Sequence, residues 1–214
     1  MGFSFICPIC GNTDPKYIGY RNGEPYCRKC ISFVCQSNEL LPPKVEKAPI
    51  HIGYKLSKEQ QTLSDKLVDN YKHGINTLVH AVCGSGKTEI VLNVIKYAIE
   101  SGDAVGFAIP RRDVVIELYD RLHDIFKENK VIAVYGGNTE VLNGNLIILT
   151  THQLFRYKNY FDLLIIDEID AFPFNGNNVL YAFFRRACKR NYVLMSATPS
   201  KEILKQFAEI FGVA

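Results

Sequence analysis

Residues 81–88, Ala-Val-Cys-Gly-Ser-Gly-Lys-Thr, constrain the fold of this chain more than any other stretch. They follow an apolar run at 77–80 that predicts a buried strand, and they precede 89–100, whose apolar residues recur at helical spacing. A turn of small residues between a strand and a helix lets backbone N–H groups close on phosphates, and the helix N-terminus adds its partial positive charge. The sequence therefore predicts a phosphate cradle.

The cradle sequence predicts a separate role for each of its last two residues. We expect Lys87 to reach the β- and γ-phosphates of ATP and Thr88 to ligate Mg²⁺. The usual pattern G-x-x-x-x-G-K-[ST] has glycine where this chain has Ala81. The residues expected to line the bound nucleotide here are Cys83, Gly84, Ser85, Gly86, Lys87, Thr88 and Glu89.

Length and composition limit the class of protein. A chain of 214 residues has room for one core of about 150 residues and a small module. Its 47% hydrophobic and 22% charged residues exclude a disordered chain, and no apolar run approaches the roughly 18 residues of a membrane span. No leader sequence is visible, so we expect a cytoplasmic protein. A net charge of +3 leaves nucleic-acid binding to local patches.

Four of the seven cysteines form two C-x-x-C pairs, Cys7 with Cys10 and Cys27 with Cys30. Two such pairs complete a tetrahedral zinc shell with no open position, which is typical of a structural site. Asn22-Gly23 between the pairs predicts a hairpin turn, so residues 1–40 are expected to form a Cys₄ zinc ribbon. The alternative is a redox dithiol or two disulfides, which a cytoplasmic location disfavours.

A Pro-rich, charged linker at 41–55 separates this module from a second domain at 56–214. A helix is expected from Leu56 to about Tyr71. Ser57 with Gln60 is a capping-box pattern, and a glutamine before the cradle could equally read the adenine edge of ATP. Both interpretations of Gln60 stay open, and one residue could serve both.

Strands and helices alternate after the cradle, which predicts a parallel sheet covered by helices on both faces. We expect the strand at 163–166 to lie beside the strand at 77–80. Ligands then gather at the carboxyl ends of the strands. The expected strands are 104–109, 131–135, 146–149, 163–166 and 192–195, and the expected helices are 113–129, 178–189 and 201–211.

Polar side chains follow two of these strands. Asp167 and Glu168 come directly after an apolar strand, where Asp167 could hold Mg²⁺ and Glu168 could deprotonate the attacking water. Ser196 and Thr198 follow the next strand, and their hydroxyls could couple the acidic pair to a nucleic-acid surface.

Other strand ends carry residue types that contact phosphodiesters: hydroxyls, arginines and exposed backbone amides. The expected DNA contacts are Pro110, Arg111, Arg112, Gly136, Thr150, Thr151, His152 and Gln153, on the opposite rim. A basic cluster at 185–190 has i, i+4 spacing, which predicts one stripe on a helix. A solvated face is favoured over a DNA contact for that stripe.

Taken in order, Gln60, the cradle, Pro-Arg-Arg, Thr-Thr-His-Gln, Asp-Glu-Ile-Asp and Ser-Ala-Thr resemble the motif series of superfamily 2 helicases. The longer segments Thr-Thr-His-Gln-Leu-Phe-Arg and Phe-Asp-Leu-Leu-Ile-Ile-Asp-Glu-Ile-Asp-Ala-Phe-Pro-Phe are similar to the ComFA family of late competence proteins. That family also begins with a four-cysteine zinc motif, which matches Cys7, Cys10, Cys27 and Cys30.

The resemblance implies a RecA-like P-loop domain after the zinc ribbon, using ATP, Mg²⁺ and Zn²⁺. It implies an ATP-dependent translocase on single-stranded DNA that helps to import transforming DNA. It also implies a ComFC-like partner and association with the membrane uptake channel from the cytoplasmic side. Such motors have a second lobe that supplies arginine fingers, worth about 10³–10⁵ in rate. This chain ends soon after Ser-Ala-Thr, so we expect a fragment that is weakly active or inactive.

Two alternatives stay open. The first is a PriA-like replication-restart helicase, although the zinc cysteines of that family follow the first lobe's motifs instead of preceding them. The second is a zinc-ribbon module that binds nucleic acid and whose ATP site is not catalytic.

Overall fold

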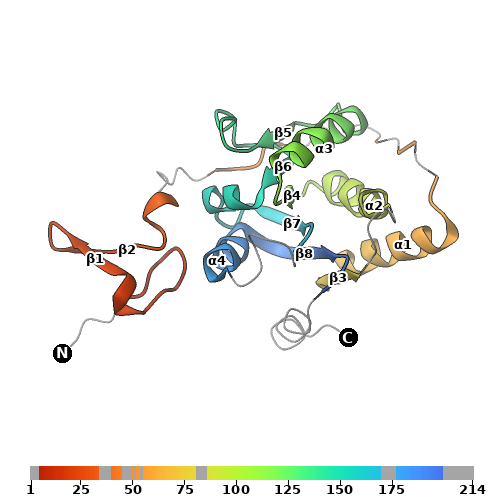
Figure 1. The fold of residues 1–214 in the computed structure, drawn as a ribbon. Coiled ribbons are helices and arrows are strands. Elements are labelled where there is room, and N and C mark those ends of the chain that lie inside the picture. Colours follow the sequence, from red (N-terminus) through yellow and green to blue (C-terminus); the bar gives the residue numbers. More distant parts are fainter. Residues whose placement is uncertain are drawn as a thin grey trace.

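The structure is a computed structural model, and it describes residues 5–33, 40–44, 50, 52–53, 55–80, 86–169 and 177–199. The cradle residues 81–85, Asp170 and the helix expected at 201–211 lie outside the described residues. Figure 1 shows a small amino-terminal hairpin unit on one side of a helix-covered sheet.

The amino-terminal unit is built around a hairpin of β1 (Ile18–Arg21) and β2 (Glu24–Cys27), which pair antiparallel. Asn22 and Gly23 join them with φ angles of 52° and 83°. Positive φ at both central residues is the requirement of a type I′ turn, so the predicted hairpin is confirmed. Two short 3₁₀ helices, η1 (Pro15–Tyr17) and η2 (Ile31–Phe33), flank the hairpin.

The larger unit is a six-stranded parallel sheet in the order β3-β8-β7-β4-β6-β5. Its strands are β3 (Thr77–His80), β4 (Val105–Ile109), β5 (Val131–Val134), β6 (Leu146–Thr150), β7 (Phe161–Ile166) and β8 (Cys188–Ser196). Its helices are α1 (Lys58–Lys72), α2 (Lys87–Glu100), α3 (Arg112–Ile125), α4 (Asn178–Ala187) and the 3₁₀ helix η3 (Thr151–Arg156).

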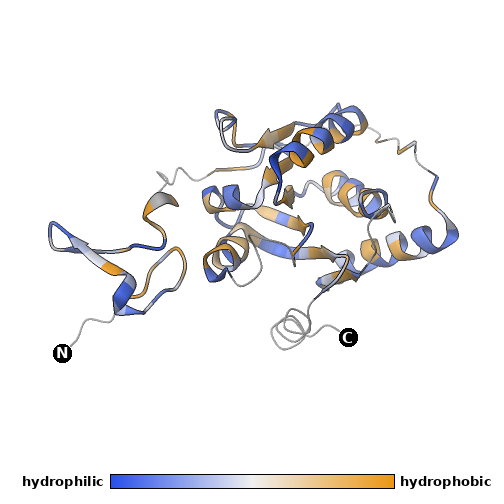
Figure 2. Cartoon of the chain, in the orientation of Figure 1, coloured by the Kyte–Doolittle hydropathy of each residue, from blue (hydrophilic) through white to orange (hydrophobic). Residues whose placement is uncertain are grey.

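Helices cover both faces of this sheet. Along β4, Val105, Phe107 and Ile109 pack into the core with α1, α2 and α3, whereas Ala108 packs into a second core with α4 and η3. Because both faces are buried, the strands are almost continuously apolar, as the sequence predicted. Figure 2 shows the apolar residues gathered in the strands and on one side of each helix.

The strand order corrects one prediction. The strand before the acidic pair, β7, does not lie beside the cradle strand β3, because β8 lies between them. The expectation that 163–166 is adjacent to 77–80 was therefore wrong. The correct order places Ser196, the last residue of β8, between the cradle strand and the acidic pair.

The basic stripe predicted at 185–190 is also wrong as a helical feature. Helix α4 ends at Ala187, and the chain turns into β8 at Cys188, which pairs with Phe161. Lys189 Nζ lies 2.8 Å from Asp162 Oδ1, and Arg190 Nη2 lies 3.3 Å from Asp103 Oδ2. The cluster consists of Arg185, Arg186, Lys189 and Arg190, and the last two are thus held by carboxylates at the amino-terminal edge of the sheet.

Candidate nucleotide and zinc sites

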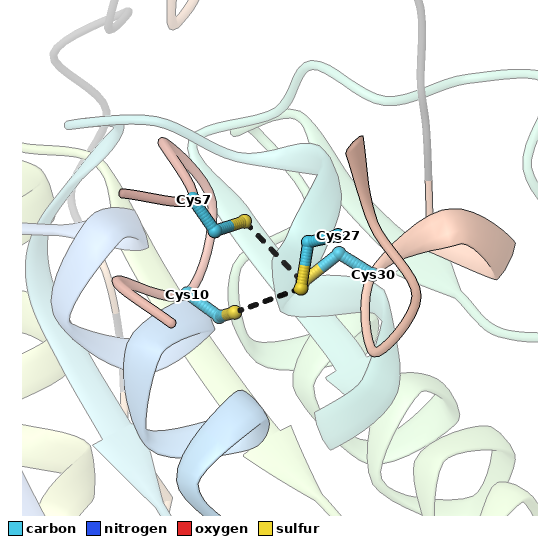
Figure 3. A group of neighbouring side chains, drawn as sticks. All are labelled: Cys7, Cys10, Cys27 and Cys30. Carbon is cyan, nitrogen blue, oxygen red and sulfur yellow. Dashed lines mark hydrogen bonds between the residues drawn. The ribbon is translucent and has the colours of Figure 1, made fainter. Parts of the chain in front are cut away.

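The four cysteines of the two C-x-x-C pairs converge on one point (Figure 3). Zn–S bonds of about 2.3 Å in a tetrahedral shell separate neighbouring sulfurs by about 3.8 Å. The Sγ atoms of Cys7 and Cys30 are 3.9 Å apart, and those of Cys10 and Cys27 are 3.8 Å apart. All four Sγ atoms lie within 4.8 Å of one another, so the donor set fits a structural zinc ion.

The protonation chemistry of the cluster also fits a cation. Burial raises the pKa of the Cys30 thiol, and the neighbouring Cys10 raises it further. Thiols packed this closely cannot all ionise alone, whereas a bound divalent cation makes the thiolates stable. The sulfur separations exceed the roughly 2.05 Å of an S–S bond, so the four cysteines are not joined as disulfides.

The amino-terminal unit, with its four clustered cysteines, contacts the larger unit through Phe33. The ring centroid of Phe33 lies 5.4 Å from that of Phe155 on η3 and 5.1 Å from that of Phe183 on α4. Close to the cysteines, Ile9 and Val179 pack together against the sulfur cluster. The module therefore rests on α4 and η3, a contact that no local sequence pattern indicated.

The cradle lysine and the first acidic residue meet at the carboxyl edge of the sheet. Lys87 Nζ, at the start of α2, lies 3.8 Å from Asp167 Oδ1, just after β7. The Asp167 N–H donates to Ala108 O at 2.9 Å, which fixes the strand end to β4. Thr88 follows on the same turn of α2 and is half-buried. An ammonium, a carboxylate and a hydroxyl in this arrangement can hold a phosphate and its metal ion.

Gln60 serves its capping role and also lies against the cradle. The Ser57 N–H donates to Gln60 Oε1 at 2.9 Å, and the Gln60 N–H donates to Ser57 Oγ at 3.2 Å, which completes the capping box of α1. A Cβ at Gly86 would lie 2.7 Å from Gln60 Nε2. The amide end of Gln60 thus occupies the space beside Gly86, which itself has a φ of 74° that glycine tolerates best.

Glu89, which the sequence predicts to line the nucleotide, pairs with an arginine of α3. Its Oε1 atom accepts a hydrogen bond from Arg121 Nη2 at 2.6 Å. The pair joins α2 to α3, and the other carboxylate oxygen, Glu89 Oε2, lies 3.2 Å from the position that a Cβ at Gly86 would take. Arg121 was not singled out from the sequence, because no motif links it to residues 81–88.

Glu168 has an unusual backbone and a cationic partner. Its φ is 54°, its N–H donates to Asp167 Oδ1 at 2.9 Å, and its Oε1 lies 3.5 Å from Arg111 Nη2. Non-glycine residues with positive φ are uncommon and cluster at functional sites. The two adjacent carboxylates therefore have different partners, Lys87 and Arg111.

The Ser-Ala-Thr segment, residues 196–198, begins at the end of β8 and lies between the ends of β3 and β7. Ser196 is fully buried, and its Oγ accepts a hydrogen bond from the Thr198 N–H at 3.1 Å. His80 Nε2, at the end of β3, lies 3.1 Å from Ala197 O. The Ile169 N–H donates to Met195 O at 3.3 Å. These bonds tie the segment both to the cradle strand and to the acidic turn.

The expected DNA-contact residues follow β4, β5 and β6, which are neighbours in the other half of the sheet. Arg111, Arg112 and Gly136 are exposed, and the Arg112 guanidinium lies 4.7 Å from the centre of the Tyr135 ring. Pro110, His152 and Gln153 are half-buried, and burial lowers the pKa of His152. Thr150 and Thr151 are buried, so their side chains lie below this surface.

Three comparisons with known proteins agree with this geometry. The sequence model of the family described as "DEAD/DEAH box helicase" matches residues 58–207. Competence protein ComFA of Bacillus subtilis is 37% identical over 94% of this chain and 47% of its own length. ComFA of Streptococcus pneumoniae is 34% identical over 94% of this chain and 48% of its own length. The chain thus spans about half the length of the curated relatives it matches.

Two further matches are more distant. Replication restart protein PriA of Rickettsia prowazekii is 29% identical over 77% of this chain and 29% of its own length. The crystal structure of a hypothetical ATP-dependent RNA helicase from Sulfolobus tokodaii has a TM-score of 0.60 and 24% identity, covering 74% of this chain and 51% of that one. That structure confirms the RecA-like fold. None of the helices in the described ranges is long and apolar enough to cross a bilayer.

Proposed function

Because the chain belongs to the DEAD/DEAH box helicase family, we propose that it is the zinc-ribbon and ATP-binding part of a DNA motor. The motor would hydrolyse ATP with Mg²⁺ to move along single-stranded DNA during the import of transforming DNA. The similarity to two competence proteins over 94% of the chain supports this role over that of the PriA-like helicases, which match less of the chain.

One observation carries the enzymatic part of the proposal. Lys87 and Asp167 are 80 positions apart in the sequence, and their charged groups lie 3.8 Å apart at the carboxyl edge of a parallel sheet. In the free protein each neutralises the other. A bound triphosphate would take Lys87 through its β- and γ-oxygens, and Asp167 together with Thr88 would hold the Mg²⁺ that accompanies it.

The neighbouring residues then supply the remaining roles. Gln60, beside Gly86, would bind the adenine edge while it still caps α1. Glu168 would take a proton from the attacking water as the water oxygen bonds to the γ-phosphorus and the bond to ADP breaks. Mg²⁺ supplies charge neutralisation to the leaving phosphates. Ser196 and Thr198 lie beside this turn, where the Thr198 N–H donates to Ser196 Oγ. They would couple the phosphate state of the bound nucleotide to the DNA surface.

The proposed DNA surface is the rim after β4, β5 and β6. The backbone of a single strand would contact this rim at Arg111, Arg112, Gly136, His152 and Gln153. The less exposed residues Pro110, Thr150 and Thr151 would lie beneath these contacts and support them. By similarity to competence proteins, we also propose a ComFC-like protein as partner. The site of action would be cytoplasmic, at the inner face of the membrane and next to the DNA-uptake channel.

Nucleic-acid-dependent ATP turnover tests this proposal. It should be measured for this chain and for the chain extended through a second helicase lobe, with single-stranded DNA, duplex DNA and single-stranded RNA of equal length. We expect single-stranded DNA to stimulate the extended chain most and this chain weakly. ATP turnover that no nucleic acid changes in the extended chain contradicts the motor function and favours a binding module with a non-catalytic site.

A further inference from the structure

Arg111 lies between the two sites that the proposed motor must connect. It follows β4, at the rim expected to bind DNA phosphates, yet its Nη2 lies 3.5 Å from Oε1 of Glu168. Glu168 follows β7, which pairs with β4 through Ala108 and Ile166. The neighbouring strands thus bring a rim arginine to the carboxylate proposed to activate water.

The backbone holds Glu168 in place for this contact. Its φ of 54° is uncommon for a residue with a Cβ, and its N–H is bonded to Asp167 Oδ1 at 2.9 Å. Such conformations persist where surrounding structure fixes them, and they concentrate at active sites and switches. Glu168 is therefore presented to Arg111 from a constrained turn.

Two other arginines, Arg112 on the same rim and Arg156 at the end of η3, contact different groups. The Arg112 guanidinium stacks over Tyr135, and Arg156 Nε donates to Gln153 Oε1 at 2.6 Å. Arg111 is 61% exposed, so a DNA phosphate can reach it from solvent. A guanidinium binds a phosphodiester in the same two-pronged way as it binds a carboxylate, so both ligands compete for it.

We propose that Arg111 is a positioning residue through which single-stranded DNA acts on Glu168. Without DNA, the ion pair holds the carboxylate of Glu168 away from the attacking water. A backbone phosphate that takes Arg111 releases Glu168, and hydrolysis accelerates. The inference rests on the proposed function, because it needs both DNA binding at the rim and Glu168 as the proton acceptor.

A double-mutant cycle on DNA binding tests the competition without any ATP turnover. The probe is a fluorescent oligothymidylate, measured by anisotropy with no nucleotide or Mg²⁺. Glu168→Gln should tighten binding by up to about five-fold, the range of exposed ion pairs, because it frees Arg111 for phosphate. In the Arg111→Ala background, Glu168→Gln should change nothing. Arg111→Ala should also reduce the slope of log K against log salt by about 0.7.

Two controls separate this effect from general charge and from misfolding. Glu140→Gln removes the same charge from an exposed site in the loop after β5, so it reports the general effect of removing a negative charge near the proposed DNA rim. Arg111→Lys should restore most of the salt slope. Arg111 makes no side-chain cap bond to α3, so its replacement leaves that helix intact.

In the extended chain, Arg111→Ala should raise the DNA-free kcat with little change in the KM for ATP.

The outcomes are distinguishable. Equal tightening by Glu168→Gln in both backgrounds, or tightening no larger than that of Glu140→Gln, overturns the role of Arg111 and leaves the motor function standing. A wild-type chain and extended chain that both fail to bind single-stranded DNA overturn the proposed function and this inference together.

Discussion

The adjacent carboxylates Asp167 and Glu168 show that the partner of a charged side chain depends on the fold around it. Their position after an apolar strand was visible in the sequence, and it suggested Asp167 as a metal ligand and Glu168 as a general base. Their partners were not, because Lys87 and Arg111 reach them only through strand pairing. The positive φ of Glu168 was equally invisible, since no glycine marks the turn.

Glu168→Gln separates ATP binding from hydrolysis. The amide keeps the size of the side chain but cannot accept the proton of water, so turnover in the extended chain should fall by about 10²–10⁴-fold. Affinity for ATP should stay within a few-fold of wild type, as measured with a fluorescent ATP analogue. Turnover near the wild-type rate would mean that another group takes the proton.

Local sequence patterns predicted the secondary-structure elements, but they did not predict the order of the strands in the sheet. The capping box of α1, the Asn-Gly turn and the apolar strands were predictable because each depends on neighbours within a few residues. The insertion of β8 between β3 and β7 was not, because buried strands with both faces covered look alike in sequence. The helix expected to continue to Lys189 ended at Ala187, where pairing with β7 overrode helical spacing.

Phe33→Ala tests the contact between η2 and the helical face formed by α4 and η3. Removing the ring deletes its packing on Phe155 and Phe183, and the free energy of unfolding should fall by about 1–3 kcal/mol. Zinc content should not change, because the four cysteines are untouched. Chemical denaturation and metal analysis measure the two quantities.

Tyr20→Ala is the matched control for this contact, since Tyr20 is an aromatic residue of the same module and is 69% exposed. Its effect on stability should be within about 0.5 kcal/mol of zero. Equal losses from Phe33→Ala and Tyr20→Ala would contradict the docking of the module.

At the scale of the whole molecule, the amino-terminal unit and the larger unit have cores of their own, which meet where Phe33 packs on α4 and η3 and where Ile9 and Val179 pack beside the cysteines. The cysteine spacing predicted that the four sulfurs gather in one cluster, because each C-x-x-C turn is local and a short hairpin joins the two. The docking of the module was not predictable, because Phe33 meets residues more than 120 positions away. Pro43, at the start of the linker, also contacts the larger unit, because Asn145 Nδ2 donates to Pro43 O at 3.0 Å.

Cys27→Ser should release zinc and unfold the amino-terminal module, since a segment of this size has little core without its metal. ATP binding should persist, because Lys87 and Asp167 belong to the larger unit, which has a core of its own. Cys188→Ser is the control: that thiol lies in β8, and burial raises its pKa to about 12, so it should hold no metal. Metal analysis and hydrogen exchange of residues 5–33 would detect the difference, and full zinc retention by Cys27→Ser would refute the ligand assignment.

The central claim is that the start of α2 and the end of β7 form an ATP site, and nucleotide affinity tests it most directly. Binding of a fluorescent ATP analogue with Mg²⁺ should be compared for wild type, Lys87→Ala and Lys96→Ala. Lys96 lies on the same helix, where it pairs with Glu100, away from the cradle. Loss of a charge-assisted contact predicts at least about ten-fold weaker binding for Lys87→Ala and no change for Lys96→Ala. Wild-type affinity in Lys87→Ala would contradict the account.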